Sequence, residues 1–426
     1  MRPDWSNVAV APADILLPKA GTDLPAWAVI ACDQYTSQPE YWRKAEELVD
    51  GKPSALRITL PEIYLPQSGG RVPLIHGAMA EYLEKGILTE AVKSGFVLTE
   101  RTTQSGARLG LVCAADLDSY DFSENSKSMI RATEGTILSR IPPRLAVRAG
   151  AALECPHVLL LLDDFQKTVI EPMYGVRETL PKLYDFPLML GGGHLKGWAV
   201  TEPALLHGVY AALEKLKQAL PGDNPLLMAV GDGNHSLATA RAHWLKLKER
   251  LSPAEAAIHP ARYALVEVEN IHDPALQFHP IHRVLFHVQG EALLADWASY
   301  CSKKGMALEK KGQASPGGQT ITVLCQGSET DVTIRNPEAA LAVGTLQRFL
   351  DDYLSRHQEA EIDYIHGEEA VRSLCSRGDA VGFLVPGLQK SALLPAVQKD
   401  GALPRKTFSM GEAQEKRYYM ECRKIV

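Results

Sequence analysis

The sequence predicts a mixed α/β fold with more than one structural region. Short apolar runs typical of strands alternate with longer segments that have helical spacing of apolar residues, and no repeat of fixed period is present. The chain has 426 residues and is 46% hydrophobic, which is enough to bury two or three cores. Disordered and fibrous classes are therefore excluded.

Strand and helix patterns alternate near the start of the chain. The apolar runs 26–32 and 55–60 predict buried strands, and residues 40–50 between them predict a helix. One face of this helix would hold Trp42, Ala45, Leu48 and Val49. These elements should contribute to the core.

Three further elements follow from local patterns. Residues 95–101 and 108–115 flank a turn-forming Gln-Ser-Gly cluster, which predicts a β-hairpin. Residues 157–163 contain four consecutive leucines and predict a buried strand that ends in two aspartates. A periodic helix is expected over 204–220, where Pro221 and Gly222 end it. We expect three α/β regions, 1–150, 151–290 and 291–426, or one intertwined unit.

A strand, a glycine turn and a helix follow one another at residues 226–250. The turn reads Gly231-Asp232-Gly233-Asn234-His235, and Ser236 begins the helix. Glycines let the backbone turn sharply and approach a ligand, while a helix N-terminus offers free amides and a positive dipole end. This geometry suits an anion, with Asn234 or Ser236 as helix cap and His235 beside a bound phosphate. The alternative is an ordinary capped helix with a surface histidine.

The segment Gly231–Ala240 resembles the turn of ParB-like and sulfiredoxin-like proteins, including free-serine kinases. In context it also resembles a bacterial and archaeal domain-of-unknown-function family, numbered one thousand and fifteen. Other segments similar to that family are 133–144, the strand into Asp163-Asp164, 279–283, 363–367 and 404–411. The resemblance therefore covers nearly the whole chain.

The resemblance implies a ParB/sulfiredoxin-like nucleotide-binding core with additional α/β elements. Its phosphate-holding role transfers to the turn residues Gly231, Asp232, Gly233, Asn234 and His235. The sequence departs from the usual turn at two positions, with Asn234 in place of a histidine and Ser236 in place of an arginine. The resemblance also implies ATP or ADP as ligand and a link to serine metabolism.

Arginines cluster in the segment 131–148. Arg140 and Arg144 could hold an anionic substrate opposite the glycine turn, since a guanidinium binds phosphate through two parallel hydrogen bonds. Glu134 lies in the same segment, which contains glycine and two prolines typical of an ordered loop. The alternative is a solvated segment whose arginines pair with nearby acids.

Carboxylates at strand ends are candidates for catalysis. Phosphoryl transfer usually needs Mg²⁺ held by carboxylates and a group that orients the acceptor hydroxyl. Asp232 and then Asp33 are preferred because each follows a strand, and ligand sites of open α/β sheets lie at strand ends. Each could instead be a turn-forming aspartate. Further carboxylates considered are Asp163, Asp164, Glu171, Glu267 and Glu269.

Four histidines between residues 272 and 287 do not indicate zinc. A strand-like run over 281–288 would send neighbouring side chains to opposite faces, which opposes tetrahedral convergence. His282 and Arg283 are better interpreted as a pair near the site.

The seven cysteines are scattered and form no Cys-x-x-Cys pair, and nothing in the sequence indicates haem or flavin. The identity of any metal stays open.

Composition and local patterns argue against DNA and membranes as binding partners. The formal net charge of -6 and the lack of a helix-turn-helix pattern disfavour DNA binding. The apolar runs are too short to span a bilayer, and the N-terminal residues lack a secretory signal, so a cytoplasmic location is expected.

From the glycine turn, the arginine segment and the resemblance, we predict an enzyme that transfers or hydrolyses a phosphoryl group of a nucleotide or phosphorylated small molecule. The alternative is a non-catalytic, switch-like nucleotide-binding protein.

Overall fold

The chain forms two structural units, and the second is inserted into the sequence of the first. The computed structural model describes residues 3–310, 317–376 and 378–426. Unit 1 comprises Met1–Gln277 and Gly411–Val426, and unit 2 comprises Phe278–Met410. This division differs from the three regions expected, because strands from both of the first two regions pair within one sheet.

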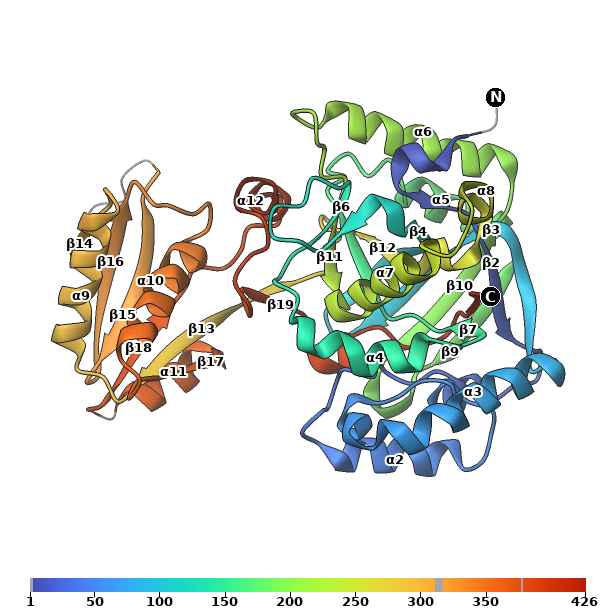
Figure 1. Cartoon of the computed structure of the whole chain (residues 1–426), viewed down its shortest axis with the longest axis horizontal. Coiled ribbons are helices and arrows are strands. Elements are labelled where there is room, and N and C mark those ends of the chain that lie inside the picture. Colours follow the sequence, from blue (N-terminus) through green and yellow to red (C-terminus); the bar gives the residue numbers. More distant parts are fainter. Residues whose placement is uncertain (1–2, 311–316, 377) are drawn as a thin grey trace. The chain divides into compact units, whose positions relative to one another are not determined.

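An 11-stranded mixed sheet forms the centre of unit 1 (Figure 1). Its main path is β5 (Tyr120–Asp121), β6 (Ile130–Ala132), β11 (Met228–Asp232), β8 (Leu159–Leu162), β12 (Tyr263–Asn270), β4 (Gly106–Asp116), β3 (Leu88–Thr103), β10 (His194–Val200) and β9 (Lys182–Pro187). Off this path, β1 (Val10–Ala11) pairs with β4, and β2 (Ala13–Pro18) pairs with β3. β6 runs parallel to β11, whereas β8 runs antiparallel to β11.

Helices cover both faces of this sheet, because its central strands alternate apolar side chains between two cores. Val112 of β4 belongs to a core with α2 and α3, whereas Leu111 belongs to a core with α5, α6, α7 and α8. The helices of unit 1 are α1 (Leu24–Trp27), α2 (Pro39–Val49), α3 (Ser68–Glu84), α4 (Ile141–Arg148), α5 (Glu171–Gly175), α6 (Pro203–Ala219), α7 (Asn234–Lys248) and α8 (Pro253–Ile258). The expected mixed α/β class is confirmed.

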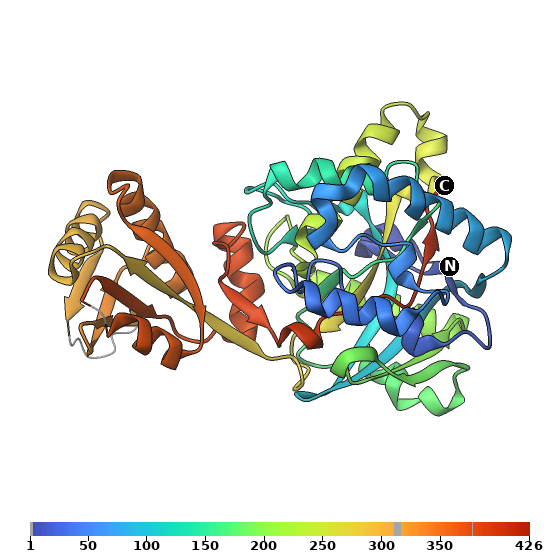
Figure 2. The same ribbon diagram turned by 90° about the horizontal axis from the view of Figure 1, so that it is seen from below.

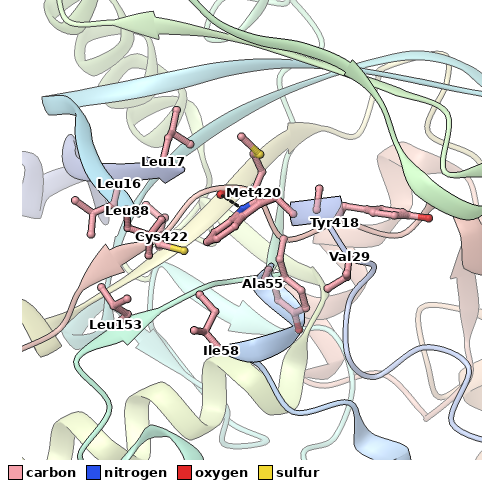
Figure 3. Close-up of a cluster of buried hydrophobic side chains, with 14 of the residues drawn as sticks. Leu16, Leu17, Val29, Ala55, Ile58, Leu88, Leu153, Tyr418, Met420 and Cys422 are labelled. Atoms are coloured by element: carbon pink, nitrogen blue, oxygen red, sulfur yellow. Dashed lines mark hydrogen bonds between the residues drawn. The ribbon is translucent and has the colours of Figure 1, made fainter. Parts of the chain in front are cut away.

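The C-terminal segment completes the first of these cores. Figure 3 shows Tyr418 beside Val29, and Cys422 beside Leu16 and Leu88, and all five side chains are buried. The Trp27 indole N–H donates to the carbonyl of Met420 at 3.1 Å. In Figure 2 the C-terminal end, in red, lies among the blue N-terminal elements, where β20 (Arg423–Lys424) pairs with β7 (Leu153–Glu154).

The two predicted N-terminal strands are wrong. Ala26 and Trp27 instead end the short helix α1, because the Asp23 carboxylate accepts from the Ala26 N–H at 3.2 Å and Pro25 occupies the first turn. Beyond the helix, Ile30 forms only an isolated β-bridge with Tyr418. The run 55–60 begins with a 3₁₀ turn, where the Ser54 hydroxyl caps the N–H of Leu56. Leu48 is 47% exposed and does not share the buried face of α2.

The other predicted elements of unit 1 are confirmed. The hairpin is β3 and β4, the four-leucine run is β8, and the periodic helix is α6. The strand before the glycine turn is β11, and the helix after it is α7, which begins at Asn234. Among the residues that the structure describes, no helix is both long and apolar enough to cross a bilayer.

Unit 2 contains a seven-stranded sheet with its own core. The sheet order is β14 (Ala307–Lys310), β16 (Ser328–Arg335), β15 (Gln319–Cys325), β18 (Ala380–Leu384), β13 (Phe278–Phe286) and β17 (Glu361–His366), with β19 (Phe408–Met410) on β13. Its helices are α9 (Gly290–Lys303), α10 (Ala342–Arg356), α11 (Glu368–Cys375) and α12 (Leu393–Asp400). Trp297 stacks on Phe349 at 5.4 Å between ring centroids and anchors this core.

Candidate functional site

Parallel pairing of β6 and β11 brings two predicted segments to one edge of the sheet in unit 1. The carboxyl ends of parallel strands meet at the same edge, so the arginine-containing loop after β6 lies beside the glycine turn after β11. The Thr133 hydroxyl, at the start of that loop, donates to the carbonyl of Val230 at 2.6 Å. Two segments about 100 residues apart are thereby held together.

Gly233 occupies a position that only glycine fills without strain. Its φ is 79°, in the left-handed region, and a Cβ there would lie 3.1 Å from the Cα of Val158. The Gly233 N–H donates to Oδ1 of Asp232 at 3.0 Å. The turn is therefore shaped by the backbone and by one carboxylate oxygen.

The predicted side-chain cap of α7 is wrong. Gly233 is the N-cap residue, and no side chain caps the helix. The Ser236 hydroxyl instead lies 3.1 Å from Nε2 of His157, which precedes β8. The first turn of α7 therefore carries the positive end of the helix dipole without a capping side chain from the described residues.

Among the residues that the structure describes, three buried oxygen atoms around the turn have no hydrogen-bond partner. They are Oδ2 of Asp232, Oδ1 of Asn234 and Oγ1 of Thr136. The ammonium of Lys416, in the C-terminal segment, lies close by, with its Nζ 3.6 Å from Oδ2 of Asp232. Buried polar atoms are normally satisfied, so such a group of unsatisfied oxygens is a typical sign of a ligand site.

His235 links the turn to the loop after β6. Its Nε2 accepts from the N–H of Ile137 at 3.3 Å, so the neutral ring carries its proton on Nδ1. Burial, followed by the positive charges of Arg144 and Arg140, lowers the pKa of His235 to about 4. The imidazole is therefore neutral at pH 7 in the absence of ligand.

Asp33 reaches the same edge through His157, a residue that the sequence analysis missed. Oδ2 of Asp33 lies 3.5 Å from Nε2 of His157, and Nδ1 of His157 lies 2.8 Å from the Tyr419 hydroxyl. Burial opposes charge on both groups, but their mutual attraction outweighs it. The pKa of Asp33 is lowered and that of His157 is raised, so the two form an ion pair.

The two candidate arginines differ in their surroundings. Arg144 is half-buried and its Nε donates to Glu62 at 2.9 Å, as the solvated-segment alternative anticipates for this residue. Arg140 is exposed, and within the described part of the chain no carboxylate pairs with it. Glu134 lies half-buried in the same loop. Arg140 is thus the arginine that is free to meet an anion.

We therefore expect opposite results from the two lysine substitutions. Arg140→Lys should weaken binding of inorganic phosphate about tenfold with unchanged stability, since an ammonium cannot make the two-pronged contact. Arg144→Lys should mainly lower the free energy of unfolding, because it breaks the contact with Glu62. Calorimetric titration and urea unfolding of both variants, with Glu62→Gln as control, would check this. Unchanged phosphate affinity in Arg140→Lys would return the loop to the solvated-surface interpretation.

Several other candidates lie elsewhere. Asp163 and Asp164 follow β8, which is antiparallel to β11, so they are at the opposite end of the strands from the turn. Asp164 is a turn-forming residue that accepts from the N–H groups of Thr168 and Val169. Antiparallel pairing therefore separates these carboxylates from Asp232.

His282 and Arg283 belong to unit 2 and have structural contacts there. Nδ1 of buried His282 accepts from the N–H of Val385 at 3.2 Å. Buried Arg283 donates to the carbonyls of Arg405 and Lys406 at 3.2 and 3.0 Å. In the described residues, no group of three His, Cys, Asp or Glu side chains is arranged to hold a metal ion.

Fold and site thus define an α/β protein with an uncapped helix at a glycine turn and unsatisfied buried oxygens beside it. Residues 16–353 match the family model described as Protein of unknown function (DUF1015). The chain belongs to this family, as its sequence motifs indicated. Comparison with curated protein sequences gives no match.

Three solved structures illustrate the structural similarity. A free serine kinase in complex with AMP has 11% identity and a TM-score of 0.39, and the match covers 74% of this chain and 92% of that one. A mutant free serine kinase in complex with ADP has 11% identity and a TM-score of 0.39, with coverage of 76% and 95%. SbnI from Staphylococcus aureus, with a C-terminal truncation, has 10% identity and a TM-score of 0.35, with coverage of 70% and 82%.

Proposed function

We propose that this protein binds a nucleotide or another phosphorylated small molecule at the turn 231–236 and transfers or hydrolyses its phosphoryl group. The observation that carries the proposal is the pair of buried, unsatisfied oxygens on Asp232 and Asn234 at the uncapped start of α7. A structural turn would satisfy these atoms internally. Burying these oxygens without a hydrogen bond costs free energy, and a bound ligand that supplies the missing partner would remove this cost.

The two oxygens suit Mg²⁺ better than they suit a bare phosphate, because both are acceptors. Mg²⁺ prefers oxygen ligands and is usually bound through one or two carboxylates together with substrate phosphates and water. Asp232 and Asn234 would hold it. When bound, the ion would neutralise charge that develops on the phosphoryl oxygens.

Positive groups at the same edge support phosphate binding. The amides of the first turn of α7 carry the positive end of the helix dipole, and Lys416 lies within reach of Asp232. Arg140 adds an exposed guanidinium from the loop after β6. These groups would position the phosphates, and positioning supplies most of the catalysis in phosphoryl transfer.

We assign to Asp33 the role of orienting the hydroxyl group that accepts the phosphoryl group. Its carboxylate is held ionised by His157 and would accept a hydrogen bond from the acceptor hydroxyl or from water. The acceptor oxygen forms a bond to phosphorus as the bond to the leaving oxygen breaks, and the acceptor proton passes to Asp33 or to solvent. Asp33 and His157 would thus orient the nucleophile.

The direct test is a binding and turnover assay on the full chain. ATP, ADP, inorganic phosphate and MgCl₂ would be screened by thermal shift, since a ligand at 100 times its Kd adds about 2.7 kcal/mol of stability. ATP consumption would then be measured with and without serine as acceptor. Binding without turnover under any condition would favour the switch-like alternative, and absence of any binding would refute the proposal.

His235→Gln is expected to lower turnover more than nucleotide affinity. The glutamine carbonyl can still accept from the N–H of Ile137, but it cannot exchange a proton near neutral pH. A bound phosphate would raise the pKa of His235 from about 4, because its negative charge offsets the burial and the arginine charges. Turnover assays and an NMR titration of the ring, with and without phosphate, would check both effects. If affinity falls while turnover per bound nucleotide stays constant, His235 is only a phosphate clamp.

A further inference from the structure

A cavity in unit 1 shares its wall with the candidate site. Its volume is about 150 Å³, and His157, Ser236 and Tyr419 are part of its lining. These residues include the histidine that pairs with Asp33 and the first-turn serine of α7. A molecule in this cavity would therefore contact His157, the partner of the Asp33 carboxylate to which the acceptor hydroxyl is assigned.

Most of the cavity wall is apolar. Its side chains come from the segment 58–65, from α3, from α4 and from the region of β7, and include Ile58, Leu60, Leu65, Met79, Val147 and Leu153. An aliphatic cavity of roughly this volume accommodates a molecule the size of benzene, whereas a polyol would lose hydration without replacement. The cavity thus selects for an apolar body.

The polar groups of the wall are almost all engaged with one another. Glu62 pairs with Arg144, and the carboxylate of Glu154 accepts from Nη2 of Arg148 at 2.7 Å. The Nε of Arg148 is the exception, because it is buried and no described residue offers it an acceptor. A ligand with one or two oxygen atoms on an apolar body would match this wall.

We infer that the acceptor of the proposed reaction is a small alcohol that carries an apolar group, which this cavity holds. The inference rests on the proposed function and specifies its substrate class. The hydroxyl would lie against His157 and Ser236, and the apolar group would lie among the leucine and isoleucine side chains. Serine, whose side chain has one carbon, would leave most of the cavity empty.

The test is an affinity series of alcohols, measured by calorimetry on the full chain with ATP binding recorded in parallel. From ethanol to butanol, the affinity should rise about fourfold for each CH₂ group, and benzyl alcohol should bind more tightly than glycerol. An affinity that does not depend on chain length would overturn the inference. If the parent protein binds no ATP, ADP or phosphate, the proposed function fails whatever the alcohols do.

Ala240→Leu would fill the cavity from α7 and should reduce benzyl alcohol affinity at least tenfold while ATP affinity changes little. Ala211→Leu adds the same atoms on the exposed side of α6 and should change neither. Equal benzyl alcohol affinity in the parent and in a folded Ala240→Leu variant would place the alcohol outside the cavity and overturn the inference.

A second readout needs no variant. Cys32 and Cys155 belong to the cavity wall, and half-buried Cys325 of unit 2 does not. Benzyl alcohol should slow N-ethylmaleimide modification of Cys32 and Cys155 and leave Cys325 unchanged, as followed by peptide mass mapping. Equal rates for all three cysteines with and without benzyl alcohol would contradict occupancy of the cavity.

Discussion

Gly233→Val is expected to weaken nucleotide binding about 100-fold or more. A β-branched residue at a φ of 79° is strained by about 1–3 kcal/mol, and its side chain would also collide with Val158. The turn must open to relieve this strain, and the first-turn amides of α7 then lose their common direction. Calorimetric titration with ATP and MgCl₂, together with urea unfolding to show that the variant is folded, would measure the effect.

The matched control is Gly222→Val. Gly222 follows α6 with a φ of 78°, but a Cβ there would meet no atom within 4 Å. The same conformational strain should therefore appear in the free energy of unfolding, while ATP affinity stays that of the parent protein. If Gly233→Val is folded and binds ATP as tightly as the control, the turn is not the phosphate cradle.

Asp232→Asn should reduce turnover about 100-fold or more and leave stability unchanged or improved. The amide oxygen can still accept from the N–H of Gly233, but the negative charge at the position of Oδ2 is lost. Removing a buried carboxylate oxygen that has no hydrogen bond relieves a desolvation cost, which offsets the lost attraction to Lys416. Gain of stability with loss of activity is typical of a functional residue.

Asp164→Asn provides the opposite case. This fully buried aspartate accepts from two backbone N–H groups, at 2.5 Å from Thr168 and 2.9 Å from Val169. Its substitution should lower the free energy of unfolding by about 1–3 kcal/mol and leave turnover per folded molecule nearly unchanged. Kinetics and urea unfolding of both variants would distinguish a functional from a structural role of Asp232. A loss of stability in Asp232→Asn with full activity would show that Asp232 only shapes the turn.

Local sequence patterns were sufficient to predict the strand, turn and helix at the centre of the candidate site. The apolar run 226–230, the glycines after it and the helical spacing beyond them are all contiguous, so β11, the turn and α7 could be predicted from neighbouring residues. The same holds for the β3 and β4 hairpin. The arginine loop was found by composition, but its position beside the turn depends on the parallel pairing of β6 and β11, which no local pattern specifies.

Residues that reach the site from far away could not be predicted. His157 precedes an apolar strand like many structural residues, and Lys416 lies in a segment without a distinctive pattern. Asp163 was a plausible candidate until the antiparallel direction of β8 placed it at the other end of the sheet. The likeness of the turn to ParB-like and sulfiredoxin-like proteins stays a prediction, as do the ligand and the cytoplasmic location.

The insertion of unit 2 has a consequence for the order in which the protein can mature on the ribosome. Lys416 and Tyr419, which contribute to the site, and Met420, which packs in the core of unit 1, are translated only after Phe278–Met410 have been made. The nascent chain must therefore keep an unfinished core in the larger unit while the inserted unit emerges and acquires its own core. Premature termination anywhere in the inserted segment would release a polypeptide with the glycine turn but without the residues that close the site.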